Sequence, residues 1–104
     1  MSEAFEIKVE NDQVVLKLQP ILDMAVADDF LESLKSCLSK HKNLTLDSSD
    51  VERVSTPCIQ VLLAAGFKVE KAGGRFSIEN VTSVFERGMT ELGVSDCLNN
   101  WRKN

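Results

Sequence analysis

Apolar and polar residues alternate in two stretches near the start of the chain, at residues 5–9 and again at residues 14–18. A repeat of two is typical of a strand with one buried face, so each stretch is predicted to form a half-buried strand. Asn11 and Asp12 lie between them and are residues that turns favour. The chain is therefore expected to open as a β-hairpin whose second strand ends at Pro20.

Two longer stretches have the apolar spacing of helices. Residues 24–40 place their apolar side chains on one face, and Asp23 precedes them as the expected N-cap. Residues 57–72 begin almost uniformly apolar, so the first half of this second helix is expected to be buried on most sides. Gly73 and Gly74 end it, because glycine readily takes the backbone conformation that stops a helix.

Short strands are expected on either side of the second helix. Residues 44–46 form an apolar strand before it, and residues 75–80 alternate again after it. A final helix is expected to open at Ser83, because a serine followed three residues later by Glu86 forms a capping box. That helix is expected to close at Gly93.

The order of these elements, β-β-α-β-α-β-α, predicts an α/β fold with a mixed sheet of four or five strands and helices mainly on one face. Residues 1–104 are expected to form one domain with a core at about residues 5–98. Gly88 lies inside the final helix and is expected to allow a close packing contact. Residues 99–104 are predicted to be frayed, except for Trp101.

The composition of the chain argues against several classes of protein. The net charge of −4, without a cluster of lysine and arginine, argues against a nucleic-acid partner. The apolar run at residues 59–67 is too short to span a bilayer, and the N-terminus lacks the pattern of a signal peptide. A cytoplasmic protein without direct membrane insertion is therefore expected. Cys37, Cys58 and Cys97 are widely spaced, which indicates reduced thiols and neither a disulfide frame nor a zinc site.

The stretch at residues 44–65 is the most informative one for function. It places two hydroxyl side chains, Ser55 and Thr56, before an apolar helix with Pro57 as the expected first helical residue. A helix N-terminus offers unpaired N–H groups and the positive end of a dipole, so it favours an anion. Thr56 is the expected N-cap, and its hydroxyl serves either as that cap alone or as a phosphoacceptor or contact residue in a binding surface.

Four segments of the chain resemble the STAS domain family (sulfate transporter and anti-sigma factor antagonist). They are the strand ending in aspartate at residues 44–47, the helix start at residues 51–59, the strand at residues 76–80 and the Leu-Gly ending at residues 92–94. The resemblance covers about residues 5–98 and is closest to stand-alone STAS proteins of bacterial chemotaxis gene clusters. It implies the mixed α/β fold of this family and no cofactor.

The resemblance also implies a partner and a switch. Anti-sigma factor antagonists of this family bind an ATP-binding serine/threonine kinase, and phosphorylation at the helix start releases it. The family motif there is an aspartate, one or two hydroxyl residues and a glycine. In this chain Ser55 replaces the aspartate, Pro57 the usual acceptor and Cys58 the glycine. Thr56, or less favourably Ser55, is the acceptor that remains.

The residues predicted to bind the partner are Asp23, Asp47, Ser55, Thr56, Pro57 and Gln60. Asp23 has the alternative role of a helix cap, and Ser55 that of a local turn-former. The polar run at residues 47–50 follows a strand, where α/β folds carry function, but its two carboxylates lack a third ligand and no metal site is expected. Cys58 is expected to be a buried, inert thiol, and the lone His41 to lie at a helix end.

Because no catalytic constellation is found, the sequence predicts a non-enzymatic regulatory module that binds a signalling protein and is controlled by phosphorylation of Thr56. Two alternatives remain open. One is a structural STAS subunit on the ATPase of a lipid-transporting ABC complex, in which Thr56 is an unmodified contact residue. The other is an accessory protein of a chemotaxis signalling array.

Overall fold

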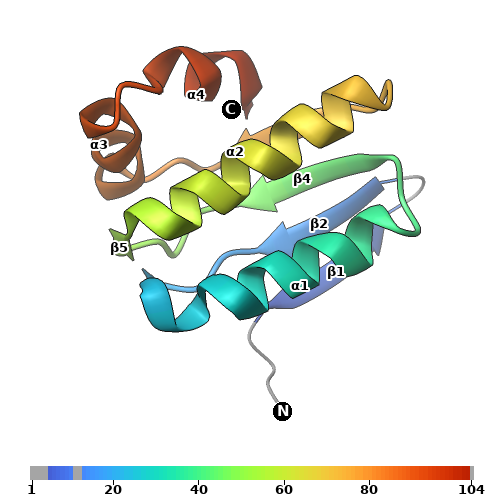
Figure 1. Cartoon of the computed structure of the whole chain (residues 1–104), viewed down its shortest axis with the longest axis horizontal. Coiled ribbons are helices and arrows are strands. Elements are labelled where there is room, and N and C mark those ends of the chain that lie inside the picture. Colours follow the sequence, from blue (N-terminus) through green and yellow to red (C-terminus); the bar gives the residue numbers. More distant parts are fainter. Residues whose placement is uncertain (1–4, 11–12, 104) are drawn as a thin grey trace.

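The computed structural model describes residues 5–10 and 13–103 as a sheet with helices over one face (Figure 1). The main sheet has five strands in the spatial order β1-β2-β4-β6-β7. Their bounds are β1 (Glu6–Glu10), β2 (Gln13–Lys17), β4 (Asn43–Asp47), β6 (Phe76–Glu79) and β7 (Arg102–Lys103). β1 is antiparallel to β2, whereas the other neighbours are parallel, so the predicted mixed sheet of an α/β fold is confirmed.

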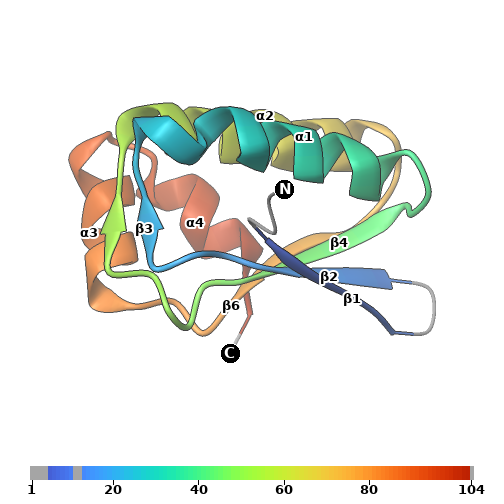
Figure 2. The ribbon, with the colours of Figure 1, turned by 90° about the horizontal axis from the view of Figure 1, so that it is seen from below.

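A second, small sheet and the helices complete the fold. β3 (Ile21–Leu22) and β5 (Arg53–Val54) pair in parallel, apart from the main sheet. The helical segments are the 3-10 turn η1 (Met24–Val26), α1 (Ala27–Leu38), α2 (Thr56–Lys71), α3 (Ser83–Glu91) and α4 (Ser95–Trp101). Figure 1 shows α1 and α2 side by side, with α3 and α4 on the side of α2 away from α1, and Figure 2 shows α1 and α2 on the same face of the sheet.

The core lies between the main sheet and the layer formed by α1 and α2. Alternate residues of the inner strands point toward these helices, and Leu16, Leu46 and Ile78 are all 0% exposed. Phe30 of α1 and Leu62 of α2 belong to the same buried cluster. Removing such side chains from water stabilises the fold by about 25 cal/mol per Å² of apolar surface.

The edge strand β1 is less buried than its alternating sequence predicts. Ile7 and Val9 are 47% and 58% exposed, although they lie opposite buried residues of β2. Phe5, which stacks on Phe30 with ring centroids 5.3 Å apart, is buried just before the strand. The strand is confirmed, but its predicted half-burial is wrong because an edge strand has a neighbour on one side alone. The predicted turn at residues 11–12 lies outside the described residues.

Two helix caps can be compared with their predictions. Asp23 is confirmed as an N-cap, since its carboxylate accepts a hydrogen bond from the N–H of Ala25 at 3.0 Å, but it starts η1 and not α1 directly. The cap of α3 is Thr82, whose Oγ1 accepts from the N–H of Phe85 at 3.2 Å. The predicted capping box at Ser83 is therefore wrong by one residue, because Ser83 is already helical.

The C-terminal residues are folded against the rest of the molecule. The sequence predicts fraying from residue 99 onward, but α4 continues to Trp101 and β7 pairs with β6. Trp101 anchors this segment, because its Nε1–H donates to the Glu70 carboxylate at 2.7 Å. The prediction of a frayed tail is therefore wrong for residues 99–103, and Asn104 lies outside the described residues.

Two glycines lie where other parts of the chain approach closely. A Cβ atom at Gly66 would lie 2.5 Å from the ring of Trp101. A Cβ atom at Gly88 would lie 2.7 Å from a methyl group of Val54, which confirms the predicted close contact at this residue. A larger side chain at either position would force its neighbour to move.

Candidate functional site

The small β3–β5 sheet positions the start of α2. Leu22 lies opposite Val54 in this sheet, and the N–H of Ser55 donates to the carbonyl of Leu22 at 2.8 Å. The residues that follow the two strands, Asp23 and Ser55, are therefore held side by side. Two segments that are far apart in the sequence meet at this end of α2.

Ser55, and not Thr56, is the N-cap residue of α2, which corrects the predicted cap. Its backbone is extended (φ −99°, ψ 161°), whereas Thr56 is the first helical residue. The Ser55 side chain makes no cap hydrogen bond, and among the described residues its buried Oγ has no hydrogen-bond partner. The N–H groups of the first turn therefore receive no acceptor from the cap side chain.

The outer face of α2 begins with exposed polar side chains. Thr56 and Gln60 are both exposed, and a separation of four residues puts them on the same side of the helix. Pro57 is half-buried beside them and supplies no N–H group. Three of the predicted partner-binding residues therefore lie together at the start of this helix.

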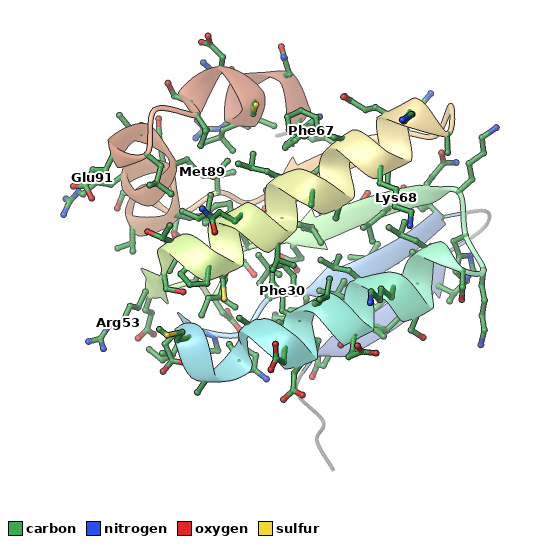
Figure 3. The ribbon with its side chains drawn as sticks, viewed as in Figure 1. Phe30, Arg53, Phe67, Lys68, Met89 and Glu91 are labelled. Carbon is green, nitrogen blue, oxygen red and sulfur yellow. The ribbon has the colours of Figure 1, made fainter. Side chains whose placement is uncertain are left out.

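Two exposed residues next to this face were missed from the sequence. Met24 in η1 is 70% exposed, the highest fraction among the exposed large apolar side chains of the described residues. The preceding residue, Asp23, fixes η1 against α2, since its carbonyl accepts from the Cys58 thiol at 3.5 Å. Figure 3 shows Arg53 pointing away from the ribbon beside the start of α2. The sequence feature that could have identified Met24 is its position as an apolar residue directly after the predicted N-cap Asp23.

We call the residues Asp23, Met24, Arg53, Thr56 and Gln60 the helix-tip surface. It combines one large apolar side chain, one hydroxyl group, one amide and charges of both signs. Ser55 lies beneath it, with its hydroxyl buried. Such a mixture is typical of a surface that binds another protein.

Cys58 lies under the same surface and is 1% exposed, as expected for a buried thiol. Burial raises the pKa of this thiol, and the negative charge of Asp23 acts in the same direction. The Ser55 hydroxyl makes no hydrogen bond of standard geometry. Its dipole lies close enough to lower the thiol pKa, which offsets part of the increase caused by burial. The thiol is therefore protonated near neutral pH and is a poor nucleophile.

Asp47 does not lie on the helix-tip surface. The residues before it in β4, Leu44 and Leu46, alternate into the core, so Asp47 points to the face of the sheet that α2 does not cover. There it lines a depression together with Val15 and Lys17. The structure therefore separates Asp47 from the other predicted partner-binding residues, and its binding role stays a prediction.

The Asp47 carboxylate is held in its own polar cluster. It accepts hydrogen bonds from the N–H of Ser49 at 3.0 Å and from Nδ2 of Asn80 at 3.1 Å. Burial raises the pKa of Asp47, but these hydrogen bonds and the charge of Lys17 more than offset it, so the pKa lies below its ordinary value of 3.8. Asp47 is therefore ionised across the physiological pH range.

Neither a metal centre nor a membrane span is found within residues 5–10 and 13–103. In this part of the chain no group of three or more histidine, cysteine, aspartate or glutamate side chains could hold a metal ion. The helices described there include none that is long and apolar enough to cross a membrane.

Known proteins resemble the chain in sequence pattern and in fold. The family model described as "Mlab, STAS domain" matches residues 5–99. The anti-sigma factor antagonist SpoIIAA in its unphosphorylated form has a TM-score of 0.79 at 14% identity, over 96% of this chain and 86% of that one. The phosphorylated form of SpoIIAA from Bacillus has a TM-score of 0.76 at 14% identity, over 96% and 89% of the two chains.

An anti-sigma factor antagonist from Mycobacterium paratuberculosis has a TM-score of 0.78 at 18% identity, over 89% of this chain and 80% of that one. At such identities these structures establish a shared fold and leave the function of this chain open. No curated protein sequence gives a significant match. Because the family model spans most of the chain, this protein belongs to the STAS domain family.

Proposed function

We propose that this protein is a non-enzymatic, cytoplasmic regulatory module that binds a protein partner through the helix-tip surface. The observation that carries the proposal is the exposure of Thr56 in the first turn of α2, a helix that packs against η1, where Met24 is exposed as well. By family resemblance the partner is a serine/threonine kinase of the anti-sigma type. The known antagonist SpoIIAA has been solved in phosphorylated and unphosphorylated forms, which supports a phosphorylation switch as part of the proposal.

Thr56 is the proposed phosphoacceptor. The Ser55 hydroxyl is buried, and Pro57 has no hydroxyl, so a kinase reaches Thr56 most readily at this end of the helix. Phosphorylation adds a charge of about −1.5 to −2 at the start of α2. The first-turn N–H groups favour that charge in the free protein, while its bulk beside Met24 opposes contact with the partner.

The switch is tested by measuring how tightly the partner binds variants that prevent or mimic phosphorylation of Thr56. The partner is recovered by affinity purification of the tagged protein from its native cells and identified by mass spectrometry, and its affinity is then measured for Thr56→Ala and Thr56→Asp. We expect Thr56→Ala to bind within a few-fold of the unchanged protein, whereas Thr56→Asp binds at least about tenfold more weakly, which is about 1.4 kcal/mol. Ser36→Asp, with the same charge at an exposed site on α1, is the matched control and keeps full affinity.

A permanent contact is the second candidate function, and Pro57 favours it because it removes the hydroxyl that antagonists of this family usually carry at that position. Thr56 would then be an unmodified contact residue on a transporter ATPase or a chemotaxis component. In that case Thr56→Ala and Thr56→Asp both weaken binding, and mass spectrometry of protein from native cells finds no phosphothreonine. Full affinity in both Thr56→Asp and Met24→Ala would reject the helix-tip surface as the interface.

A further inference from the structure

A narrow apolar groove of about 250 Å³ lies between α1 and α2. The two helices run next to each other over the sheet (Figures 1 and 2), and the groove follows the seam between them. Its floor contains Leu34 and Ala65, which are 2% and 7% exposed, and its walls contain the half-buried Leu31, Leu38 and Val61. None of its lining residues belongs to the helix-tip surface.

The groove continues toward the C-terminal ends of both helices. A second depression of about 100 Å³ shares Leu38 and Lys68 with the first and extends to Val69 and Ala72. On α1 the apolar wall from Leu31 to Leu38 covers two helical turns, or roughly 10 Å at a rise of about 1.5 Å per residue. The combined depressions therefore form an elongated apolar channel that opens to solvent along one side.

Every charged side chain that lines this channel is basic. Lys35 and Lys68 border the first depression, and Lys42 borders the second together with His41. Figure 3 shows Lys68 on the side of α2 that faces α1. The ion pairs found among the described residues involve none of these three lysines. In a chain with a net charge of −4, this arrangement places unneutralised positive charge at the rim of an apolar channel.

We infer that this channel binds a fatty acid. The alkyl chain lies along the leucine and alanine side chains of the floor, and the carboxylate lies near the ammonium groups of Lys68 and Lys42 at the open end. Lysine suits this task because its methylene stem covers apolar surface while its charged end stays in water. The ion pair then forms at the surface, where neither charge has to be buried.

The recessed shape of the channel favours an alkyl chain over a partner helix. A helix with its side chains is about 10–12 Å across and docks onto a broad apolar surface. None of the strongly exposed large apolar residues found in the described chain lines the channel. Its apolar surface is instead sunk between two helices, where a single chain of methylene groups can enter.

Titration calorimetry of the full chain with dodecanoate, kept below its micelle concentration, tests the inference. We expect saturable binding at one site, with amide chemical-shift changes along the channel at Leu31 and Leu38 and not at Thr56. Dodecyltrimethylammonium has the same alkyl chain with the opposite charge and is expected not to bind. Equal binding of both amphiphiles, or binding of anionic vesicles without binding of free dodecanoate, overturns the inference.

Variants locate the site. Lys68→Glu is expected to weaken dodecanoate binding by about fivefold or more, because it replaces an attraction by a repulsion. Lys71→Glu, an exposed site on the same helix outside the channel, is the matched control and is expected to leave affinity unchanged. Ala64→Trp fills the channel from its exposed rim and is expected to abolish binding while thermal unfolding shows an intact fold. Full affinity in either folded variant, Lys68→Glu or Ala64→Trp, overturns the inference.

Discussion

Adjacent hydroxyl side chains at the start of α2 have opposite environments. The Ser55 hydroxyl is buried at the N-cap, and the Thr56 side chain is exposed one residue later. The difference arises because the N–H of Ser55 is bonded to Leu22 in the β3–β5 sheet, which holds Ser55 against the body of the molecule. The proposed phosphorylation at this end of α2 therefore favours Thr56, whose side chain is the exposed one.

Asp47 is expected to make the stability of the protein depend on pH. Its folded pKa lies below the ordinary value of 3.8, because hydrogen bonds from Asn80 and Ser49 outweigh the opposing effect of burial. A depressed carboxylate pKa stabilises the folded state fully above the unfolded pKa, and this contribution is lost as the pH falls through the folded pKa. Asp47→Asn is therefore expected to lower the free energy of unfolding at pH 7 by about 0.5–1 kcal/mol, and by progressively less below about pH 4.

Urea unfolding across this pH range measures the effect. Glu32→Gln removes an exposed carboxylate from the middle of α1 and is the control, with little expected change at either end of the range. A difference between Asp47→Asn and the unchanged protein that stays constant from pH 7 to pH 3 would contradict the role given to the Asp47 charge.

At the scale of elements, the start of α3 depends on one threonine. Thr82 Oγ1 accepts from the N–H of Phe85 at 3.2 Å and donates to the carbonyl of Val51 at 2.9 Å. Thr82→Ala removes the cap and this link to the loop between β4 and β5, so we expect it to lower the free energy of unfolding by about 1 kcal/mol or somewhat more. Ser83→Ala is the matched control and is expected to change it by less than about 0.5 kcal/mol. A larger effect of Ser83→Ala in urea unfolding would show that the cap lies at Ser83 after all.

The sequence predicted the elements that carry their own periodicity. Four strands of the main sheet and the helices α1, α2 and α3 follow from alternation or helical spacing within each segment. β3 and β5 are two residues long, which is too short to show a periodic pattern. They form because the fold brings Leu22 and Val54 opposite each other, just before the start of α2. α4 was missed for a similar reason. Its apolar pattern is too short to predict a helix by itself, and the segment is held by the hydrogen bond of Trp101 to Glu70 of α2.

Parts of the site were predictable and parts were not. The hydroxyl residues before Pro57 marked the start of α2 to within one residue, because proline is tolerated at the beginning of a helix; the N-cap is Ser55 and the first helical residue is Thr56, where Thr56 and Pro57 were predicted. The burial of the Ser55 hydroxyl depends on the β3–β5 pairing and left no local signal. The position of Asp47 was available from strand alternation, since Leu44 and Leu46 fill the core and Asp47 must point the other way.

At the scale of the whole molecule, α2 links three regions. Its first turn carries Thr56, its middle lines the apolar channel through Ala64 and Ala65, and its far side carries the C-terminal segment. The packing against the C-terminus is supported by ion pairs from Arg102 to Glu86 at 3.5 Å and from Lys103 to Glu79 at 3.6 Å. These ion pairs are partly exposed and contribute little, so the docking of this segment depends mainly on Trp101.

The contact between Gly66 and Trp101 tests this dependence through a double-mutant cycle. A Cβ atom at Gly66 would lie 2.5 Å from the Trp101 ring and 2.9 Å from Phe76, so Gly66→Ala forces a well-packed contact apart. We expect Gly66→Ala to lower the free energy of unfolding by about 1–3 kcal/mol in the unchanged protein. In a Trp101→Leu background the closest clash is gone while that of Phe76 remains, so the same substitution is expected to have a clearly smaller effect.

The interaction free energy between Gly66→Ala and Trp101→Leu shows whether the two residues are coupled through this contact. Residues in direct contact show interaction energies of about 0.5–3 kcal/mol in such cycles, whereas independent sites are additive within about 0.5 kcal/mol. Gly88→Ala, whose added Cβ atom meets Val54 on another part of the molecule, is the control and should have the same effect with or without Trp101→Leu. If Gly66→Ala is also additive with Trp101→Leu, the C-terminal segment does not depend on the close contact between Gly66 and Trp101, and the pairing of β7 with β6 contributes more to its docking.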